Sequence, residues 1–561
     1  MKKLINNVVS LFLFMVFVLL VLGVGSAADA DQKKNMELVG TNDLQARSTY
    51  QPTVHRYPGD RYILFGGEHA LGTNPVTGQP LPSFNPLTKL NEPNGTSIVD
   101  VTNPKKPVYL AHIPVGNPVA PPATPVPGGS QMVRVCDGST LPVGNTRVYM
   151  LRSYGQGNPG AHEIWDVTDP SKPKGVRTVA GGNPVITNLV TTHKSWWECD
   201  SGIAYIVGRR SNDTADGWQK GNEHHIFIFY LGDPENPKST DFLRDWALDG
   251  QEPGGVLPLH FTLIPQIHGP ISTGPSKDNT LLGNSPNPIA ATGATLDRVY
   301  FAYGIGNNGV MQIVDRTKLL PPPWGKGIRC GSAASSLIPA APGIPPCNAA
   351  QGDFQSAEVG RWVMNPVNGA HTSYPIGNIA VPDFAVNEQG AVRDFVIVTS
   401  EETSNQCTGP RNLTAVVEVT ENVLGQPGSR PQGQATFQVL EESGEFCDVG
   451  GRFGPHSTQE EFGPPFYQKL VFVAYFNAGV RAVDIRDPFR PTEVGFFIPA
   501  TNANTDFRCV DNSDPGTCKI AIQTNNVATD DRGFIYIVDR ADTGLHILQL
   551  TGAALKVVTG K

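Results

Sequence analysis

Charged residues are scarce in this sequence of 561 residues, at 17%, and positive charge is not in excess, because 43 Lys and Arg face 51 Asp and Glu. A general basic surface for nucleic acid needs the opposite balance, so nucleic acid is not expected as a partner. The low charge also excludes a coiled coil or helical bundle. H-E-x-x-H, G-x-S-x-G and P-loop motifs are absent as well, so motifs leave open whether the protein is an enzyme.

Turn-forming residues are abundant instead. The chain has 60 Gly and 49 Pro, roughly one residue in five, against about 12% in average proteins. The hydrophobic content of 39% is sufficient for a core and argues against disorder. The composition therefore predicts a loop-rich, mostly β protein.

The N-terminus has the pattern of a secretory signal peptide over residues 1–28. Lys2 and Lys3 precede an apolar run over residues 8–25, and small residues follow at 26–28. We expect cleavage there and a secreted or periplasmic location in the cell envelope; an uncleaved membrane anchor is the alternative. After residue 28 no second apolar run of membrane length occurs, so no membrane association is expected once the signal is removed.

The eight cysteines include no C-x-x-C pair, which argues against a zinc-finger type of site. An exported protein is exposed to oxidising conditions, so we expect all eight to form disulfides. Proximity in the sequence favours the pairs Cys136–Cys199, Cys330–Cys347, Cys407–Cys447 and Cys509–Cys518.

A strand-and-turn unit recurs along the chain. Its sharpest copies are GTSIVDVTNPKKP at 95–107, HEIWDVTDPSKP at 162–173 and GVRAVDIRDPFRP at 479–491. Each is an alternating apolar strand that ends in Asp-Val or Asp-Ile and closes with a Pro-containing turn. A second β-rich run, often containing Val-Tyr, precedes each copy, as at 147–151, 298–302 and 534–538. Seven such units of four strands predict an all-β fold, a single seven-bladed β-propeller over residues 36–551 with long loop insertions, at 71–94 and 317–365 among others.

The repeated VDVTDPxxP unit resembles the LVIVD repeat of secreted bacterial propellers. This resemblance implies a propeller outside the cytoplasm and little about activity, since propellers carry many unrelated sites. In architecture alone, the chain is also distantly similar to the selenium-binding-protein family, which comprises propellers with axial histidines and methanethiol oxidase activity. We also expect the ring to close through residues 36–40 or 42–48, paired with the last blade near 555–559.

Histidines recur at one position of four consecutive blades. The segments before the Val-Tyr strands should be the innermost strands, and aligning them places together Gln51, Gln131, His193, His268, His371, His456 and Asn525 or Asn526. The four histidines should therefore form an arc at the mouth of the axial channel, with carboxamides completing the ring. Four imidazoles without a carboxylate or thiolate suit copper or zinc better than calcium or magnesium. The alternative is a structural lining that hydrogen-bonds water and holds the inner strands together.

The loops after the second strands should open on the same face as the histidines. They carry the charged or polar residues Glu68, His69, Arg152, Arg209, Arg210, Glu401, Glu402, Asp539 and Arg540. Such a rim can orient a small polar ligand, although solvated surface is the alternative for each residue.

Three functions remain open from the sequence. The first is an exported propeller that binds a small ligand, a metal or an extracellular protein partner at its axial funnel. The second is a metal-dependent oxidoreductase that uses copper or zinc held by His193, His268, His371 and His456. The third is a structural interaction protein of the cell envelope. The substrate and the oligomeric state are not encoded in any recognisable motif.

Overall fold

The structure is a computed structural model. It describes residues 30–123, 128–154, 161–179, 189–190, 193–210, 225–236, 238, 241–248, 250–251, 265–275, 297–328, 357–387, 390–420, 431–439, 445–509 and 515–560. The expected signal peptide and the expected pair Cys330–Cys347 lie outside these ranges. Within them, no helix is both long and apolar enough to cross a bilayer.

Seven antiparallel sheets of four or five strands make up the described part of the chain, and each is one blade. Within a blade the strands follow one another in sequence from the axis outward. Blade 1 consists of β3 (Thr49–Tyr57), β4 (Arg61–Glu68), β7 (Gly95–Asp100) and β8 (Val108–Pro114). Blade 2 consists of β9 (Val133–Asp137), β10 (Val148–Tyr154), β11 (Ala161–Asp166) and β12 (Lys174–Thr178). Blade 3 consists of β14 (Ser195–Trp197), β15 (Ile203–Arg210), β16 (His225–Tyr230) and β17 (Phe242–Trp246), with β13 (Leu189–Val190) also paired to β15.

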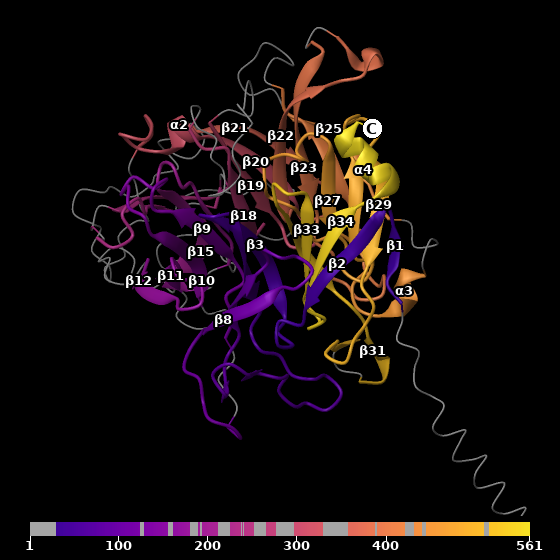
Figure 1. Cartoon of the computed structure of the whole chain (residues 1–561). Helices are drawn as coiled ribbons and strands as arrows, with labels where there is room; N and C mark the ends of the chain where they lie inside the picture. Colours follow the sequence, from indigo (N-terminus) through magenta and orange to yellow (C-terminus); the bar gives the residue numbers. More distant parts are fainter. Residues whose placement is uncertain are drawn as a thin grey trace, which may run out of the picture.

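The second half of the chain continues the ring in the same way (Figure 1). Blade 4 consists of β18 (Ile267–Ser272), β19 (Arg298–Tyr303), β20 (Val310–Asp315) and β21 (Glu358–Val363). Blade 5 consists of β22 (Thr372–Ala380), β23 (Val392–Thr399), β24 (Thr414–Glu418) and β25 (Gln432–Phe437). Blade 6 consists of β26 (Ser457–Thr458), β27 (Leu470–Ala474), β28 (Val480–Asp484) and β29 (Thr492–Ile498), extended by β1 (Gln32–Lys34). Blade 7 consists of β32 (Thr524–Thr529), β33 (Phe534–Asp539), β34 (Leu545–Leu550) and, at its outer edge, β2 (Met36–Asn42).

The innermost strands contact one another around a complete ring. β3 contacts β9, β9 contacts β14, and the contacts continue through β18, β22, β26 and β32 back to β3. The prediction of a seven-bladed propeller is therefore confirmed. Ring closure uses the expected N-terminal strand, but the expected partner was wrong. β2 pairs with β34, with Met36 opposite Leu550, whereas Gly552–Thr559 forms the helix α4, which contacts β28 and β29.

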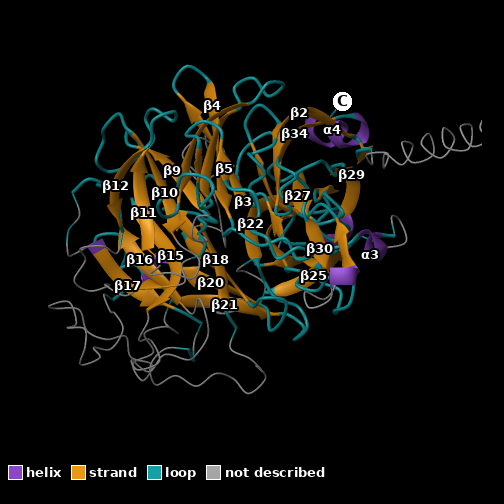
Figure 2. Ribbon diagram, turned by 90° about the horizontal axis from the view of Figure 1, so that it is seen from below, coloured by secondary structure: helices purple, strands orange, loops and turns teal. Residues whose placement is uncertain are grey.

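The blades have a similar shape because local features of the sequence recur in them. The Asp at the end of the third strand accepts a hydrogen bond from the backbone N–H two residues later, at 3.0 Å in Asp100 and Asp166 and 3.1 Å in Asp484. This bond closes the turn to the fourth strand. A β-bulge also interrupts the pairing of the third strand with the outermost strand in all seven blades. Bulges increase strand twist, which gives each blade its propeller shape (Figure 2).

The long loops carry small elements of their own. The expected insertion in blade 1 contains the short hairpin of β5 (Phe84–Asn85) and β6 (Leu90–Asn91), and a second hairpin joins β30 (Phe507–Cys509) to β31 (Cys518–Ile520). The remaining short helices are α2 (Arg316–Leu319), α3 (Phe446–Val449), η4 (Asp383–Ala385) and η7 (Pro515–Thr517).

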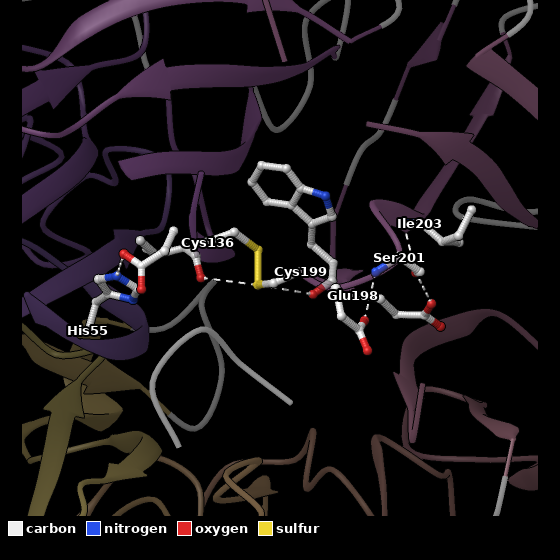
Figure 3. The surroundings of a disulfide bond; sticks show 10 residues. His55, Cys136, Glu198, Cys199, Ser201 and Ile203 are labelled. Carbon is white, nitrogen blue, oxygen red and sulfur yellow. Dashed lines mark hydrogen bonds and ion pairs between the residues drawn. A yellow bond between two sulfur atoms is a disulfide. The ribbon is translucent and has the colours of Figure 1, made fainter. Parts of the chain in front are cut away.

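Disulfides fasten neighbouring segments as expected. Cys136 on β9 and Cys199 after β14 form a disulfide that joins the innermost strands of blades 2 and 3 (Figure 3). Cys407 pairs with Cys447. Cys509 and Cys518 occupy facing positions of β30 and β31, and Cys518 is disulfide-bonded. No cysteine in the described part of the chain is free.

A buried ion pair beside the first disulfide joins blades 3 and 4. The Glu198 carboxylate, next to Cys199 in Figure 3, accepts hydrogen bonds from Arg316 Nε at 2.9 Å and Arg316 Nη2 at 2.6 Å. It also accepts hydrogen bonds from Ser272 Oγ and Tyr205 Oη. Because every oxygen of this buried carboxylate is bonded, the desolvation of its charge is compensated. The blades beneath the histidine positions are thus rigidly joined.

Candidate metal centre

The four predicted histidines meet at the axial mouth. His193 lies two residues before β14, His268 is the second residue of β18, and His371 and His456 directly precede β22 and β26. Ring centroids are 5.0 Å apart for His193–His268, 4.3 Å for His268–His371 and 4.1 Å for His371–His456. The imidazoles of blades 3 to 6 therefore form a continuous arc, as the alignment predicted.

Two overlapping groups of side chains bring possible metal-ligating atoms close together. One is His193, His268 and His371; the other is His371, Glu401 and His456. In each group the donor atoms lie within 4.8 Å of one another, and all five residues are buried. The expectation of a cluster without a carboxylate was wrong, because Glu401 belongs to the second group.

Glu401 reaches the cluster from the loop that follows β23. Its carboxylate oxygens lie 3.4 Å from His268 Nε2, 3.7 Å from His456 Nε2 and 3.0 Å from Arg452 Nη1. Burial opposes its ionisation, but His456, Arg452 and Arg540 outweigh burial and lower the pKa of Glu401 below its ordinary value. Glu401 is therefore a carboxylate at neutral pH, which is the ligand form.

Burial keeps the imidazoles neutral. It is the main cause that lowers the pKa values of His193, His268 and His371 well below the ordinary value for histidine. It also lowers the pKa of His456 to about 3, against the opposing effect of Glu401. A neutral imidazole has the lone pair that binds a metal ion. The side chains thus carry the protonation states that a metal site requires.

The carboxamides complete the ring through hydrogen bonds, as expected. Gln131 contacts His193 Nδ1 through its carbonyl oxygen and His69 Nδ1 through its amide nitrogen, the latter at 2.9 Å. The Asn525 side-chain amide donates to the Tyr50 backbone carbonyl at 3.0 Å, and the backbone carbonyl oxygen of Asn525 lies 2.7 Å from His456 Nδ1. A proton on Nδ1 of His456 therefore directs the Nε2 lone pair of this residue into the cluster.

Tyr50 is the central residue that the alignment missed. Its hydroxyl lies 2.7 Å from His371 Nε2 and 3.4 Å from His193 Nε2, and its ring meets those of His69, His193 and His456 edge-on. The pairing of β3 with β4 is interrupted between Thr49 and Gln51, so that Tyr50 is the bulged residue. The same interruption occurs at His268 in blade 4 and at Asn525 in blade 7. The structural equivalent of His268 in blade 1 is therefore Tyr50, whereas Gln51 contacts Asn526.

Only some of the predicted rim residues reach the cluster. His69, Glu401 and Arg540 do so. Glu68 instead accepts hydrogen bonds from the Gly95 N–H and from His112, and Arg152 pairs with Glu163 at 2.8 Å. Glu402 and Asp539 accept backbone hydrogen bonds from Ser404 and Gln523. The side chains of Arg209 and Arg210 lie outside the described part of the structure.

Side chains that lie further along the innermost strands meet across the ring beneath the cluster. Arg134 of blade 2 forms an ion pair with Glu460 of blade 6, across the ring. Its guanidinium also lies 4.6 Å from the Trp196 ring centroid, and Trp196 packs against Phe462. A ligand of the histidines therefore approaches from the mouth, where the Arg452 and Arg540 side chains are 24% and 26% exposed.

The fold and the site together define the class: an all-β, seven-bladed propeller with a buried histidine–carboxylate cluster at its axial mouth. No protein-family model and no curated protein matches the chain. Among solved structures, Sqt1 of Chaetomium thermophilum is similar over 91% of this chain and 99% of its own, at 9% identity and a TM-score of 0.42. A periplasmic gluconolactonase of Pseudomonas aeruginosa covers 83% of this chain and 99% of its own, at 12% identity and a TM-score of 0.36. The soluble aldose sugar dehydrogenase of Escherichia coli covers 92% and 99%, at 10% identity and a TM-score of 0.33.

Proposed function

We propose that the protein is an exported β-propeller that binds one transition metal ion, copper or zinc, at the mouth of its axial channel. The observation that carries this proposal is that two groups of possible ligands share His371. One group is His193, His268 and His371, and the other is His371, Glu401 and His456. The disulfides and the signal-like N-terminus support export. The resemblance of the repeat to LVIVD propellers points to the same compartment.

The donor atoms suit a metal ion that is neither very hard nor very soft, such as copper or zinc. Imidazole suits copper and zinc, and one carboxylate is compatible with both, whereas calcium and magnesium require several oxygen donors. A neutral imidazole offers one lone pair. Because His371 belongs to both groups, we propose that a single ion is bound at a time, by three histidines or by two histidines and Glu401.

Three buried nitrogen atoms in and beside the cluster support the proposal that a metal ion or another ligand binds there. Nδ1 of His268, Nε2 of His456 and Nε2 of His69 have no hydrogen-bond partner among the described residues. Leaving a buried polar atom without a partner costs about 1–3 kcal/mol each. A purely structural network would be expected to satisfy these atoms, whereas a metal ion or a ligand at the mouth accounts for them.

The test is the metal content of protein expressed in the periplasm and purified without refolding. We expect close to one equivalent of copper or zinc in the wild type and at least a tenfold loss of affinity in His268→Gln. Glutamine is the residue that blade 2 carries at the corresponding position, as Gln131, so the fold should accept it. His55→Gln is the matched control, because His55 pairs with Asp137, away from the cluster. A wild type that binds neither metal, or equal binding by His268→Gln, would overturn the proposal.

A copper-dependent oxidoreductase is the second candidate. It is favoured by the Tyr50 hydroxyl, which lies 2.7 Å from His371 Nε2 and can hold or move a proton there, and by the partly exposed mouth above the buried donors. When bound, copper would supply one-electron redox chemistry. If this function is correct, the electron paramagnetic resonance signal of Cu(II) in the copper-loaded protein should disappear when ascorbate reduces the ion. The signal should return on exposure to air. A signal that ascorbate does not change would reject it.

A further inference from the structure

Cationic side chains from three blades surround the histidine cluster. Lys194 Nζ lies 3.3 Å from His371 Nδ1, Arg452 Nη1 lies 3.0 Å from Glu401 Oε1, and Arg540 Nη1 lies 4.0 Å from the same oxygen. They come from blade 3, from the loop before blade 6 and from the end of β33 in blade 7. The metal site is therefore bordered by positive charge on several sides.

The carboxylates nearby have hydrogen-bond or ion-pair partners of their own. Glu401 faces all three cations, and its hydrogen-bonded partner is Arg452, which also donates to the Glu402 carbonyl. Asp506 lies 3.8 Å from another cation, Arg508. Asp539 uses its oxygens to accept the N–H groups of Gln523 and Ala541. Glu401 interacts with all three cations, and a bound divalent metal ion would add further positive charge beside them.

Arg540 is the cation whose partner is missing. Its guanidinium makes no hydrogen bond within the described part of the chain, and its contact with Glu401 is too long for one. An arginine guanidinium carries its positive charge at neutral pH, and the Arg540 side chain is 26% exposed at the mouth. A guanidinium has five N–H donors. Here these donors face the cluster at the partly exposed mouth.

We propose that Arg540 binds the carboxylate group of a small organic acid, which enters at the mouth and lies against the histidine cluster. This inference rests on the proposed metal site for the identity of the neighbouring group, but the position of the Arg540 guanidinium at the mouth does not depend on a metal. A planar guanidinium binds a carboxylate through two parallel hydrogen bonds, which favours this anion over a spherical one. Lys194 and Arg452 add attraction without competing for the same oxygen atoms.

The test compares isotope-labelled acetate with acetamide, its neutral counterpart of the same shape, by NMR line broadening at fixed ionic strength. Metal-free and zinc-loaded proteins are both measured. We expect acetate to bind at least tenfold more tightly than acetamide. Arg540→Gln should weaken the affinity for acetate at least tenfold. Arg540→Lys should have an intermediate affinity, because it keeps the positive charge but loses the planar guanidinium with its paired N–H donors. Arg486→Gln is the matched control, since Arg486 pairs with Asp484 in a turn on the other face of the propeller.

Each outcome decides the inference. Equal binding of acetate and acetamide, or an Arg540→Gln variant that binds acetate like the wild type, would overturn it. Tighter binding of phosphate than of acetate would overturn the assignment to a carboxylate. A wild type that takes up no metal but binds acetate through Arg540 would reject the proposed metal function alone. Unchanged zinc content in Arg540→Gln would show that the lost acetate binding comes from the anion site.

Discussion

Each blade presents a residue to the axis at, or just before, the start of its innermost strand, and in three blades a bulge determines which residue that is. His268, Tyr50 and Asn525 each occupy the unpaired position of such a bulge. A bulged residue has no partner in the ladder, so its side chain can turn away from the alternation of the strand. This is how a phenol, an imidazole and a carboxamide reach the same ring from strands whose neighbouring side chains face other directions.

The hydroxyl of Tyr50 should matter most when no metal is bound. In the Tyr50→Phe variant, His371 Nε2 loses its 2.7 Å hydrogen bond. We expect the free energy of unfolding of the metal-free protein to fall by about 1–3 kcal/mol, the cost of a buried group without its partner. A bound zinc ion would occupy the lone pair of His371, so the loss should be smaller in the zinc-loaded protein.

Urea unfolding with and without zinc measures this difference. The zinc-induced gain in stability should be larger for Tyr50→Phe than for the wild type. An equal loss in both states would mean that the Tyr50 hydroxyl and the metal do not share His371.

At the scale of elements, the outer strand β2 closes the ring, and burial differs from residue to residue along it. Met36 is fully buried in a cluster with Leu548, Leu550 and Val557, whereas Leu38 on the same strand is 36% exposed. Met36→Ala should therefore lower the free energy of unfolding by about 2–5 kcal/mol through lost burial and a residual cavity.

Leu38→Ala is the matched control on the same strand. It removes side-chain carbon atoms from a more exposed position, so its cost should stay within about 0.5 kcal/mol. Denaturant unfolding of both variants decides the matter. Similar losses for the two would show that the burial of Met36 does not contribute more to the stability of the closed ring than the exposed Leu38 does.

The strands could be predicted because their sequence pattern repeats from blade to blade. The parts of the site that depart from this pattern could not. The recurring Asp-Val and Val-Tyr strands indicated seven blades, and the spacing before them identified His193, His268, His371 and His456. Tyr50 was missed because a one-residue bulge shifts the register, and a bulge leaves no signature in a single sequence. Glu401 was placed on the rim because its approach depends on the course of the loop after β23. Strand β34 was missed as the closing partner because residues 552–559 were read as continuing the β pattern.

At the scale of the whole molecule, buried titratable groups of opposite type should shape the dependence of stability on pH. Burial alone lowers the pKa of His162 to about 3, and burial lowers that of His546 to about 4. Burial and, to a lesser degree, Glu460 raise the pKa of Glu461 to about 8. The histidines favour the folded state at high pH. Glu461 favours it at low pH and loses this contribution as the pH rises toward 8.

His162 offers the cleanest measurement, because it lies in blade 2 on β11 and burial is the one cause of its shift. Its pKa is lower when folded than the value of about 6.5 expected when unfolded, so below that pH the unfolded chain takes up the proton first. The stability that neutral His162 contributes is complete above pH 6.5 and is lost as the pH falls toward 3. The loss amounts to about 1.4 kcal/mol per pH unit, or about 2 kcal/mol at pH 5.

His162→Phe should remove this part of the dependence of the free energy of unfolding on pH, and urea unfolding of the metal-free protein from pH 7 to pH 5 measures it. Ile164→Val, on the same strand, should cost about 0.5–1.5 kcal/mol at every pH and leave the slope unchanged. If His162→Phe keeps the wild-type slope, His162 does not take up a proton on unfolding, and the acid sensitivity of the propeller lies in its other buried histidines.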